Sequence, residues 1–188
     1  MDPVLYSVSG TLTLYSNNVE LSDSQRFPFE YKVSIMIVLT ETGLNMEAGV
    51  YNFGETTMNF QFLFHNYFQI SDIQEIEING FSGEYFDAND NCTKTIVGSV
   101  KNIDESINSI FKAPINGIEI VDGLTTIKIE SENMSKIVVW CPWKASLAKE
   151  NADYHDDAYK ECVCVEPGQV SEDTERVSDS KKDNERII

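Results

Sequence analysis

The stretch Phe27–Leu39, FPFEYKVSIMIVL, decides the fold of this chain. Its odd-numbered positions are all apolar or aromatic. Because side chains alternate between the two faces of a strand, one face of this stretch is predicted to be buried along its whole length. Met36 and Val38 make the even-numbered positions of the second half apolar as well. We therefore expect a long strand in the centre of a packed sheet, buried on both faces in its second half.

Shorter alternating segments recur on both sides of this stretch, and turn residues separate them. They are residues 4–14, 48–53, 57–65, 73–79, 94–103, 118–121, 124–130 and 136–143. Gly80 and Gly83 are expected to bracket a turn, and Asp122-Gly123 suits the two-residue turn of a hairpin. The connections are too short for the helical crossovers of a parallel sheet. The sequence therefore predicts an all-β fold, an antiparallel β-sandwich of about eight or nine strands.

Two helices and a tail complete the predicted organisation. Asp104 is placed as the N-cap of one short helix, since Ile107, Ile110 and Phe111 follow at helical spacing before Pro114. Residues 144–165 are expected to form a C-terminal helix packed on the β-sandwich domain, which spans residues 1–143. Residues 166–188 have few apolar and many charged side chains, which is typical of a flexible acidic tail.

The charge of the chain is strongly negative. Thirty-one acidic residues face 14 basic ones, for a net charge of −17. Such a surface repels nucleic acid and anionic membranes and favours a cationic partner. The first residues do not have the pattern of a signal peptide, and no apolar run approaches the ~20 residues that span a bilayer. Four scattered cysteines do not suggest a disulfide framework, so a cytoplasmic protein is expected.

The interval between Lys32 and Lys94 contains nine acidic residues and no lysine or arginine. Unpaired carboxylates on one sheet repel each other, so such a face favours a basic protein that neutralises it. Glu75 and Glu77 are expected to point to the same side of one strand, about 6.6 Å apart, a spacing that also permits mimicry of nucleic acid. The predicted partner-binding residues are Asp72, Glu75, Glu77, Glu84, Asp87 and Asp90.

Other candidate sites are weaker. Residues 87–91 begin like a calcium-binding loop, but Cys92 stands where the turn glycine is needed, so an Asx-rich turn is favoured. Cys162 and Cys164, with His155 and Asp156 or Asp157, are metal-ligand types at a spacing that matches no standard zinc pattern. No metal or cofactor is predicted. A row of aromatic side chains at 60, 62 and 64 fits core packing better than a ligand-binding face.

Catalytic motifs are absent from the sequence. His65 and His155 are its only histidines, and neither lies in a nucleophile motif, although a glycosidase-like carboxylate pair stays open. The prediction is a non-enzymatic protein-binding factor of the inhibitor or immunity type, which neutralises a basic partner protein such as a nuclease or toxin. The alternatives are a β-sandwich module that binds carbohydrate or calcium, and a structural subunit of a viral or appendage assembly. The oligomeric state is left open.

Overall fold

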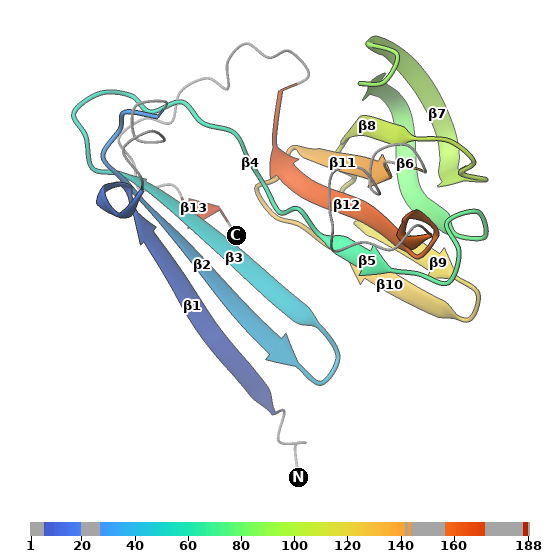
Figure 1. Cartoon of the computed structure of the whole chain (residues 1–188), viewed down its shortest axis with the longest axis horizontal. Coiled ribbons are helices and arrows are strands. Elements are labelled where there is room, and N and C mark those ends of the chain that lie inside the picture. Colours follow the sequence, from blue (N-terminus) through green and yellow to red (C-terminus); the bar gives the residue numbers. More distant parts are fainter. Residues whose placement is uncertain (1–5, 20–26, 142, 144–156, 172–185, 188) are drawn as a thin grey trace. The chain divides into compact units, whose positions relative to one another are not determined.

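The computed structural model describes residues 6–19, 27–141, 143, 157–171 and 186–187 (Figure 1). The chain divides into two compact units, of which the first combines residues 1–60 with 176–188 and the second spans residues 61–175. Every strand pair in both units is antiparallel. The predicted all-β, antiparallel class is therefore confirmed, whereas the sandwich arrangement stays a prediction.

The first unit is a four-stranded sheet in the order β1-β2-β3-β13. Its strands are β1 (Ser7–Tyr15), β2 (Tyr31–Thr40), β3 (Leu44–Asn52) and β13 (Arg186–Ile187), and the 3-10 turn η1 (Ser16–Asn18) follows β1. The predicted central strand is β2, which indeed lies between β1 and β3. The expected burial of its second half is wrong, because Ile37 and Leu39 are 42% and 55% exposed. Antiparallel sheets commonly pack one face and expose the other, so apolar residues on both faces of β2 do not require that both faces be buried.

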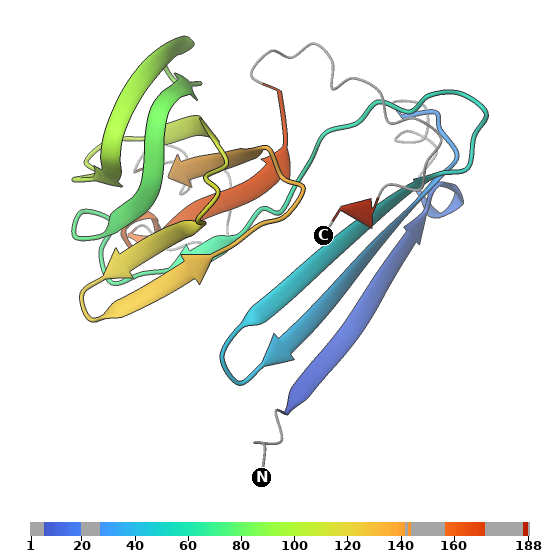
Figure 2. The same ribbon diagram turned by 180° about the vertical axis from the view of Figure 1, so that it is seen from behind.

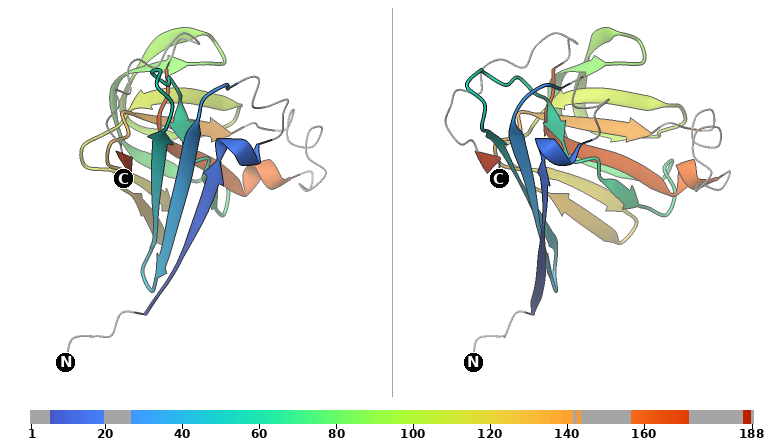
Figure 3. Two further views of the ribbon diagram at one scale, coloured as in Figure 1. Left: turned by 90° about the vertical axis from the view of Figure 1, so that its left-hand side faces the viewer. Right: turned by 60° about the vertical axis from the view of Figure 1, so that its left-hand side comes forward.

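The second unit is a larger sheet in the order β10-β9-β6-β8-β11-β12-β4, to which β7 adds by pairing with β6 and β5 by pairing with β12. Its strands are β4 (Phe62–Leu63), β5 (Tyr67–Gln69), β6 (Glu77–Asp87), β7 (Cys92–Lys101), β8 (Ile107–Lys112), β9 (Ile118–Asp122), β10 (Thr125–Ile129), β11 (Lys136–Cys141) and β12 (Cys162–Gln169). β6 and β7 curl strongly, as Figures 1 and 3 show.

A bulge causes part of this curvature. The pairing of β6 with β7 shifts register between Asn79 and Phe81, so Gly80 is the extra residue. Its φ of 113° lies in a region that favours glycine, and an added Cβ would lie 2.7 Å from the carbonyl oxygen of Gly117. The turn expected at Gly80 and Gly83 is therefore wrong, because β6 continues through both glycines to Asp87.

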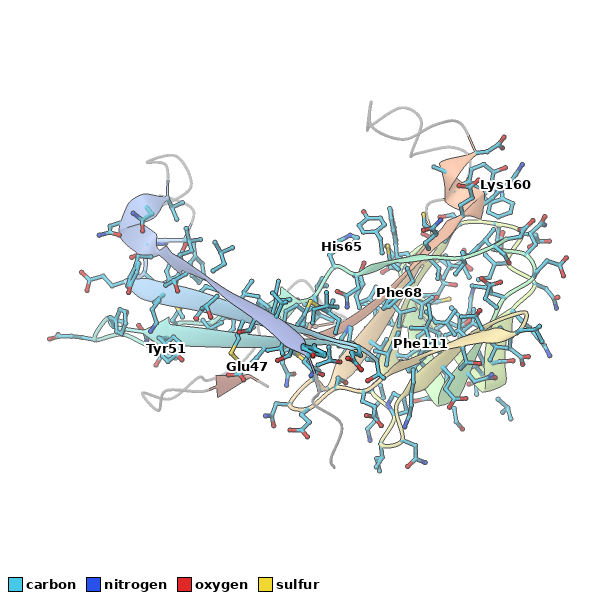
Figure 4. All side chains as sticks on the ribbon, turned by 90° about the horizontal axis from the view of Figure 1, so that it is seen from below. Glu47, Tyr51, His65, Phe68, Phe111 and Lys160 are labelled. Carbon is cyan, nitrogen blue, oxygen red and sulfur yellow. The ribbon has the colours of Figure 1, made fainter. Side chains whose placement is uncertain are left out.

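The core of the second unit is built mainly from β-branched side chains. The fully buried members include Ile73, Ile78, Ile120, Val139, Val163 and Val165. Phe81 and Phe111 stack inside this core with ring centroids 4.1 Å apart, and Phe68 packs against it (both Phe68 and Phe111 are labelled in Figure 4). The predicted strand over residues 57–65 shrinks to Phe62–Leu63.

Local patterns are confirmed in the hairpin β9–β10, coloured yellow in Figure 2, and in β11. In the hairpin Asp122 pairs with Thr125, so the two-residue loop is Gly123-Leu124, one position later than expected. The short helix predicted after Asp104 is wrong, since Ile107–Lys112 is strand β8. It buries Ser109 and Phe111 at a period of two and pairs with β6 and β11. Tertiary pairing overrides the helical spacing here.

The C-terminal helix is not found among the residues that the structure describes. Residues 144–156 lie outside them, Ala158–Lys160 forms the 3-10 turn η2, and β12 begins at Cys162. β12 continues to Gln169, so the first residues assigned to a flexible tail are strand, and residues 172–185 lie outside the described ranges. The predicted domain division stays a prediction. Within the described ranges, no helix is long and apolar enough to cross a membrane.

Candidate functional site

β12 aligns residues from two distant parts of the sequence. On its outer edge Leu63 of β4 pairs with Gly168, and Tyr67 of β5 pairs with Cys164. The same register, carried through the three residues between β4 and β5, sets His65 opposite Glu166. The amide of Phe64 fixes this segment by donating a 3.0 Å hydrogen bond to the carbonyl oxygen of Pro167. His65 and Glu166 therefore face each other across two neighbouring strands of the sheet.

Glu166 is a carboxyl group buried inside the protein. The residue is only 3% exposed, and Oε1 lies 3.0 Å from Nδ1 of His65. Despite this distance, no group in the described ranges donates a well-aligned hydrogen bond to Oε1. Burial raises the pKa of Glu166 to about 7, because the charged form loses its hydration. At neutral pH this carboxyl group can therefore both hold and release a proton.

In contrast to Glu166, His65 is partly exposed, since 49% of its side chain is accessible to solvent. Figure 4 labels it on the segment that joins β4 to β5. The ring of Tyr67 stacks on the imidazole at 4.8 Å, and the ring of Trp140 meets it edge-on at 5.8 Å. These two aromatic rings fix the orientation of the imidazole. They also give the site flat apolar surfaces, of the kind that line ligand pockets.

Cys164 adds a thiol to this cluster. It lies on the same face of β12 as Glu166, is 1% exposed, and offers its sulfur within 4.8 Å of ligand atoms of both His65 and Glu166. Burial, and then the charge of Glu166, raise the pKa of the Cys164 thiol. The predicted metal set paired Cys162 and Cys164 with His155 and neighbouring aspartates. His155 and Asp156 lie outside the described residues, and Asp157 forms an ion pair with Lys160 at 2.8 Å.

The arrangement suits proton transfer. Glu166 is a base of near-neutral pKa, and His65 places an imidazole, the side chain that acid–base catalysis uses most often, beside it. General acid–base catalysis requires such groups within hydrogen-bond reach of the atoms they serve. The site can therefore remove a proton from one atom of a bound molecule while it delivers a proton to a neighbouring atom.

The predicted partner-binding carboxylates lie elsewhere, on β6 and its flanking turns. Asp87 accepts a 2.6 Å hydrogen bond from Nζ of Lys94, which also pairs with Asp90. Burial alone would raise the pKa of Asp87. The bonds from Lys94 and from the amides of Asp90 and Asn89 lower it on balance. The same two amide bonds form the Asx turn that the sequence favoured over a calcium loop.

The remaining acids do not form one continuous surface of unpaired charge. Glu77 accepts a 2.5 Å hydrogen bond from Ser99 and lies 3.8 Å from Nζ of Lys101. Asp72 caps a turn by accepting a 2.9 Å hydrogen bond from the amide of Gln74. Glu75 lies in that turn, before β6 begins, so the expectation that it shares a strand with Glu77 is wrong. Glu84 is exposed on β6. Lysines of the adjacent strand β7 thus neutralise several of these carboxylates from within the protein.

The sequence analysis named His65 only as one of two histidines outside any nucleophile motif and assigned Glu166 to the tail, so it predicted neither as a site residue. The available signal was the alternation of Val163 and Val165 with polar or thiol residues, followed by Pro167, which together indicate a buried strand. That signal was outweighed by the charged residues after it.

Comparison with known proteins now identifies the chain's relatives. The family described as aldose 1-epimerase matches residues 7–181. A protein of Cenchrus ciliaris provisionally named glucose-6-phosphate 1-epimerase is 27% identical over 157 residues, which are 79% of this chain and 47% of that protein. A protein of the same provisional name from Haemophilus influenzae is 28% identical over 108 residues, 56% of this chain and 38% of that protein. The chain thus spans half or less of the length of these relatives.

Solved structures share the fold. A protein of Salmonella typhimurium provisionally named a mutarotase, YeaD, superimposes with a TM-score of 0.75 at 21% identity, over 88% of this chain and 54% of that one. A galactose mutarotase-like protein of Clostridium acetobutylicum gives a TM-score of 0.62 at 16% identity, over 90% of this chain and 54% of that one. The curled antiparallel sheets of this protein are those of the mutarotase-like fold.

These findings correct the functional prediction. A match over residues 7–181 to a family of sugar epimerases overturns the assignment as a non-enzymatic inhibitor or immunity protein. The same match contradicts the predicted basic protein partner. The error came from treating the net negative charge as a binding property, whereas lysines of the protein itself pair with several of the acids concerned.

Proposed function

Because the chain belongs to the aldose 1-epimerase family, we propose that it interconverts the two anomers of an aldose at C1, with Glu166 as general base and His65 as general acid. The observation that carries the proposal is the buried carboxyl group of Glu166, with a pKa of about 7, 3.0 Å from the half-exposed imidazole of His65. Glu and His are the side chains most often used for such proton transfers.

The proposed reaction opens and recloses the sugar ring. Glu166 removes the proton from the hydroxyl on C1, the electrons of that O–H bond form a C=O bond, and the bond from C1 to the ring oxygen breaks. His65 in its protonated form donates a proton to the departing ring oxygen. Rotation about the C1–C2 bond presents the other face of the aldehyde. Reversal of both proton transfers then closes the ring as the other anomer, with both residues restored.

The short separation of the two groups supports this assignment. The anomeric oxygen and the ring oxygen are bonded to the same carbon, so the base and the acid that serve them must lie within a few ångströms of each other. Oε1 and Nδ1 meet that requirement at 3.0 Å. Tyr67 and Trp140, which surround the imidazole, offer flat rings for the apolar face of a sugar.

A phosphorylated aldose is the proposed substrate class, since two relatives carry the name of a glucose-6-phosphate epimerase. Lysines support it. Glu166 pairs with Val138, and Lys136 lies two residues before Val138 on the same face of β11. Lys112 of β8 lies opposite Lys136, so two neighbouring strands bring two positively charged side chains to one point of the sheet, where a phosphate group would be attracted. The spacing of two strand residues, about 6.6 Å, suits a sugar whose C1 lies at Glu166 and whose phosphate lies at the lysines.

The first experiment measures anomer exchange by magnetisation-transfer NMR with glucose and glucose 6-phosphate, above the spontaneous background. Glu166→Gln should lower the catalysed rate by about 10²–10⁴-fold, the usual contribution of a general base. The rate of the unaltered protein should rise with pH through about 7, as Glu166 loses its proton. Glu84→Gln, an exposed carboxylate on β6, is the matched control. Equal rates in both variants would refute the assignment of Glu166.

The second experiment tests the lysines. Lys112→Ala should raise KM for glucose 6-phosphate by about tenfold or more, the loss expected for one hydrogen bond to a charged group, and leave KM for glucose unchanged. Lys128→Ala is the control, since Lys128 pairs with Glu130 on β10 and its flank. A loss of equal size with both sugars would show that Lys112 does not recognise phosphate.

We also propose that the sheets belong to a β-sandwich and that the protein is cytoplasmic. Antiparallel sheets with curled strands support the first proposal. All four cysteines carry free thiols, which suits a reducing compartment and supports the second.

A further inference from the structure

The site contains three side chains of the types that bind metal ions. His65 Nδ1 or Nε2, Cys164 Sγ and a carboxylate oxygen of Glu166 all lie within 4.8 Å of one another. One register fixes all three, since Cys164 and Glu166 share a face of β12 and His65 stands on the neighbouring segment. Strand pairing therefore fixes the relative positions of the three residues of this cluster.

The donor set is specific in its chemistry. An imidazole nitrogen, a thiolate sulfur and a carboxylate oxygen are the ligands of Zn²⁺ and similar ions, whereas Mg²⁺ and Ca²⁺ select oxygen ligands alone. Bond lengths of 2.0–2.3 Å to a tetrahedral zinc ion separate its ligand atoms by about 3.3–3.6 Å. The ligand atoms must therefore approach one another by about 1 Å to bind zinc. Rotation of the half-exposed His65 side chain can bring its nitrogen closer to the other two ligand atoms.

Burial supports a cation at this point. Glu166 Oε1 is a buried oxygen to which no residue in the described part of the chain gives a well-aligned hydrogen bond. Such a group is costly unless something compensates it. Cys164 is buried beside it, while the His65 side chain is 49% exposed to solvent.

We propose that His65, Cys164 and Glu166 bind one thiophilic divalent cation of the Zn²⁺ class. Three protein ligands leave a fourth position for water. Binding replaces the thiol proton of Cys164 by the metal–sulfur bond, and that proton passes to the buffer. The site stands on its geometry whether or not the protein is an epimerase. If the protein is an epimerase, the bound ion coordinates the Glu166 carboxylate that the reaction needs as a base. Zinc should then inhibit the reaction in competition with the sugar.

The test titrates Zn²⁺ into the full chain by calorimetry. One ion should bind per chain, and Cys164→Ser should weaken this binding by more than about 100-fold. Mutation of residues that only support metal ligands typically costs about 10–100-fold, so a larger loss identifies Cys164 as a ligand. Cys162→Ser, two residues away on the same strand, should bind like the unaltered protein. Cd²⁺ should give a thiolate absorption band that the Cys164 variant lacks, and Mg²⁺ should not bind. Zinc should also raise Tm, because it binds the folded state.

Several results would overturn the proposal. One is that the Cys164 variant binds zinc as tightly as the unaltered protein. Another is that the Cys162 variant loses as much zinc affinity as the Cys164 variant. A third is that Mg²⁺ binds with an affinity similar to that of Zn²⁺. If Cys164→Ser does not fold, as judged by circular dichroism, His65→Asn serves in its place for the same calorimetry. Anomer exchange measured in chelator separates the two proposals. Activity without zinc binding refutes the metal site alone, and zinc binding at Cys164 without activity refutes the epimerase alone.

Discussion

Glu166 is a residue at which the requirements of its proposed function and of stability conflict. The proposed role of Glu166 as a general base needs a pKa near 7 at neutral pH, and burial of the carboxyl group without an aligned hydrogen bond raises its pKa to about that value. The same burial makes the charged form costly in the folded state. The residue should therefore lower the stability of the protein wherever it is ionised.

The pH dependence of stability follows from this conflict. The unfolded carboxyl group has a pKa near 4.5 and the folded one a pKa of about 7. Between these values the folded state holds a proton that the unfolded state has released, so stability falls as pH rises through this window. The free energy of unfolding should decrease by about 3 kcal/mol relative to Glu166→Gln between pH 5 and pH 8.

Urea denaturation at several pH values checks this prediction, with Glu84→Gln as the exposed control. A difference between the unaltered protein and Glu166→Gln that stays constant from pH 5 to pH 8 would contradict it. The substitution should then prove stabilising at high pH and inactivating at every pH.

At the scale of single elements, the bulge in β6 offers a direct test of backbone strain. Gly80 and Gly83 both have positive φ, but an added Cβ at Gly80 would lie 2.7 Å from the carbonyl oxygen of Gly117, whereas one at Gly83 would meet nothing within 4 Å. Gly83→Ala should cost about 1–3 kcal/mol of unfolding free energy from strain alone. Gly80→Ala should cost more, because the backbone of β6 must also move.

Chemical denaturation of both alanine variants gives the comparison, and equal losses would show that the contact with Gly117 relaxes at no cost. The matched pair separates steric contact from conformational strain, since the two glycines lie on the same strand.

The sequence predicted the elements that local patterns determine and missed those that depend on pairing with distant strands. The hairpin β9–β10 and the strand β11 follow from alternation and a local turn. β8 was misread because apolar residues 107, 110 and 111 also fit a helix, and only pairing with β6 and β11 decides between the two. The site was missed for the same reason. The register of β12 against β4 and β5 joins His65 to Glu166, and no local pattern encodes that register.

At the scale of the whole molecule, the net charge of −17 acts on stability and not through a basic partner. Lysines of β7 pair with some of the acids, but the excess of negative charge remains and repels itself in the compact state. Raising salt from about 10 mM to about 500 mM shortens the Debye length several-fold and should raise Tm. Differential scanning calorimetry in sodium chloride measures this, and a Tm that falls with salt would contradict it.

The pairing of β12 with the segment around His65 has a consequence for biogenesis. His65 and Glu166 are separated by about a hundred residues of sequence, so the proton-transfer pair closes a very long loop. During synthesis a nascent polypeptide that has emerged as far as β11 already contains the imidazole but lacks its carboxyl partner. The proposed proton-transfer pair can therefore form only after β12 has been synthesised and has paired with β4 and β5.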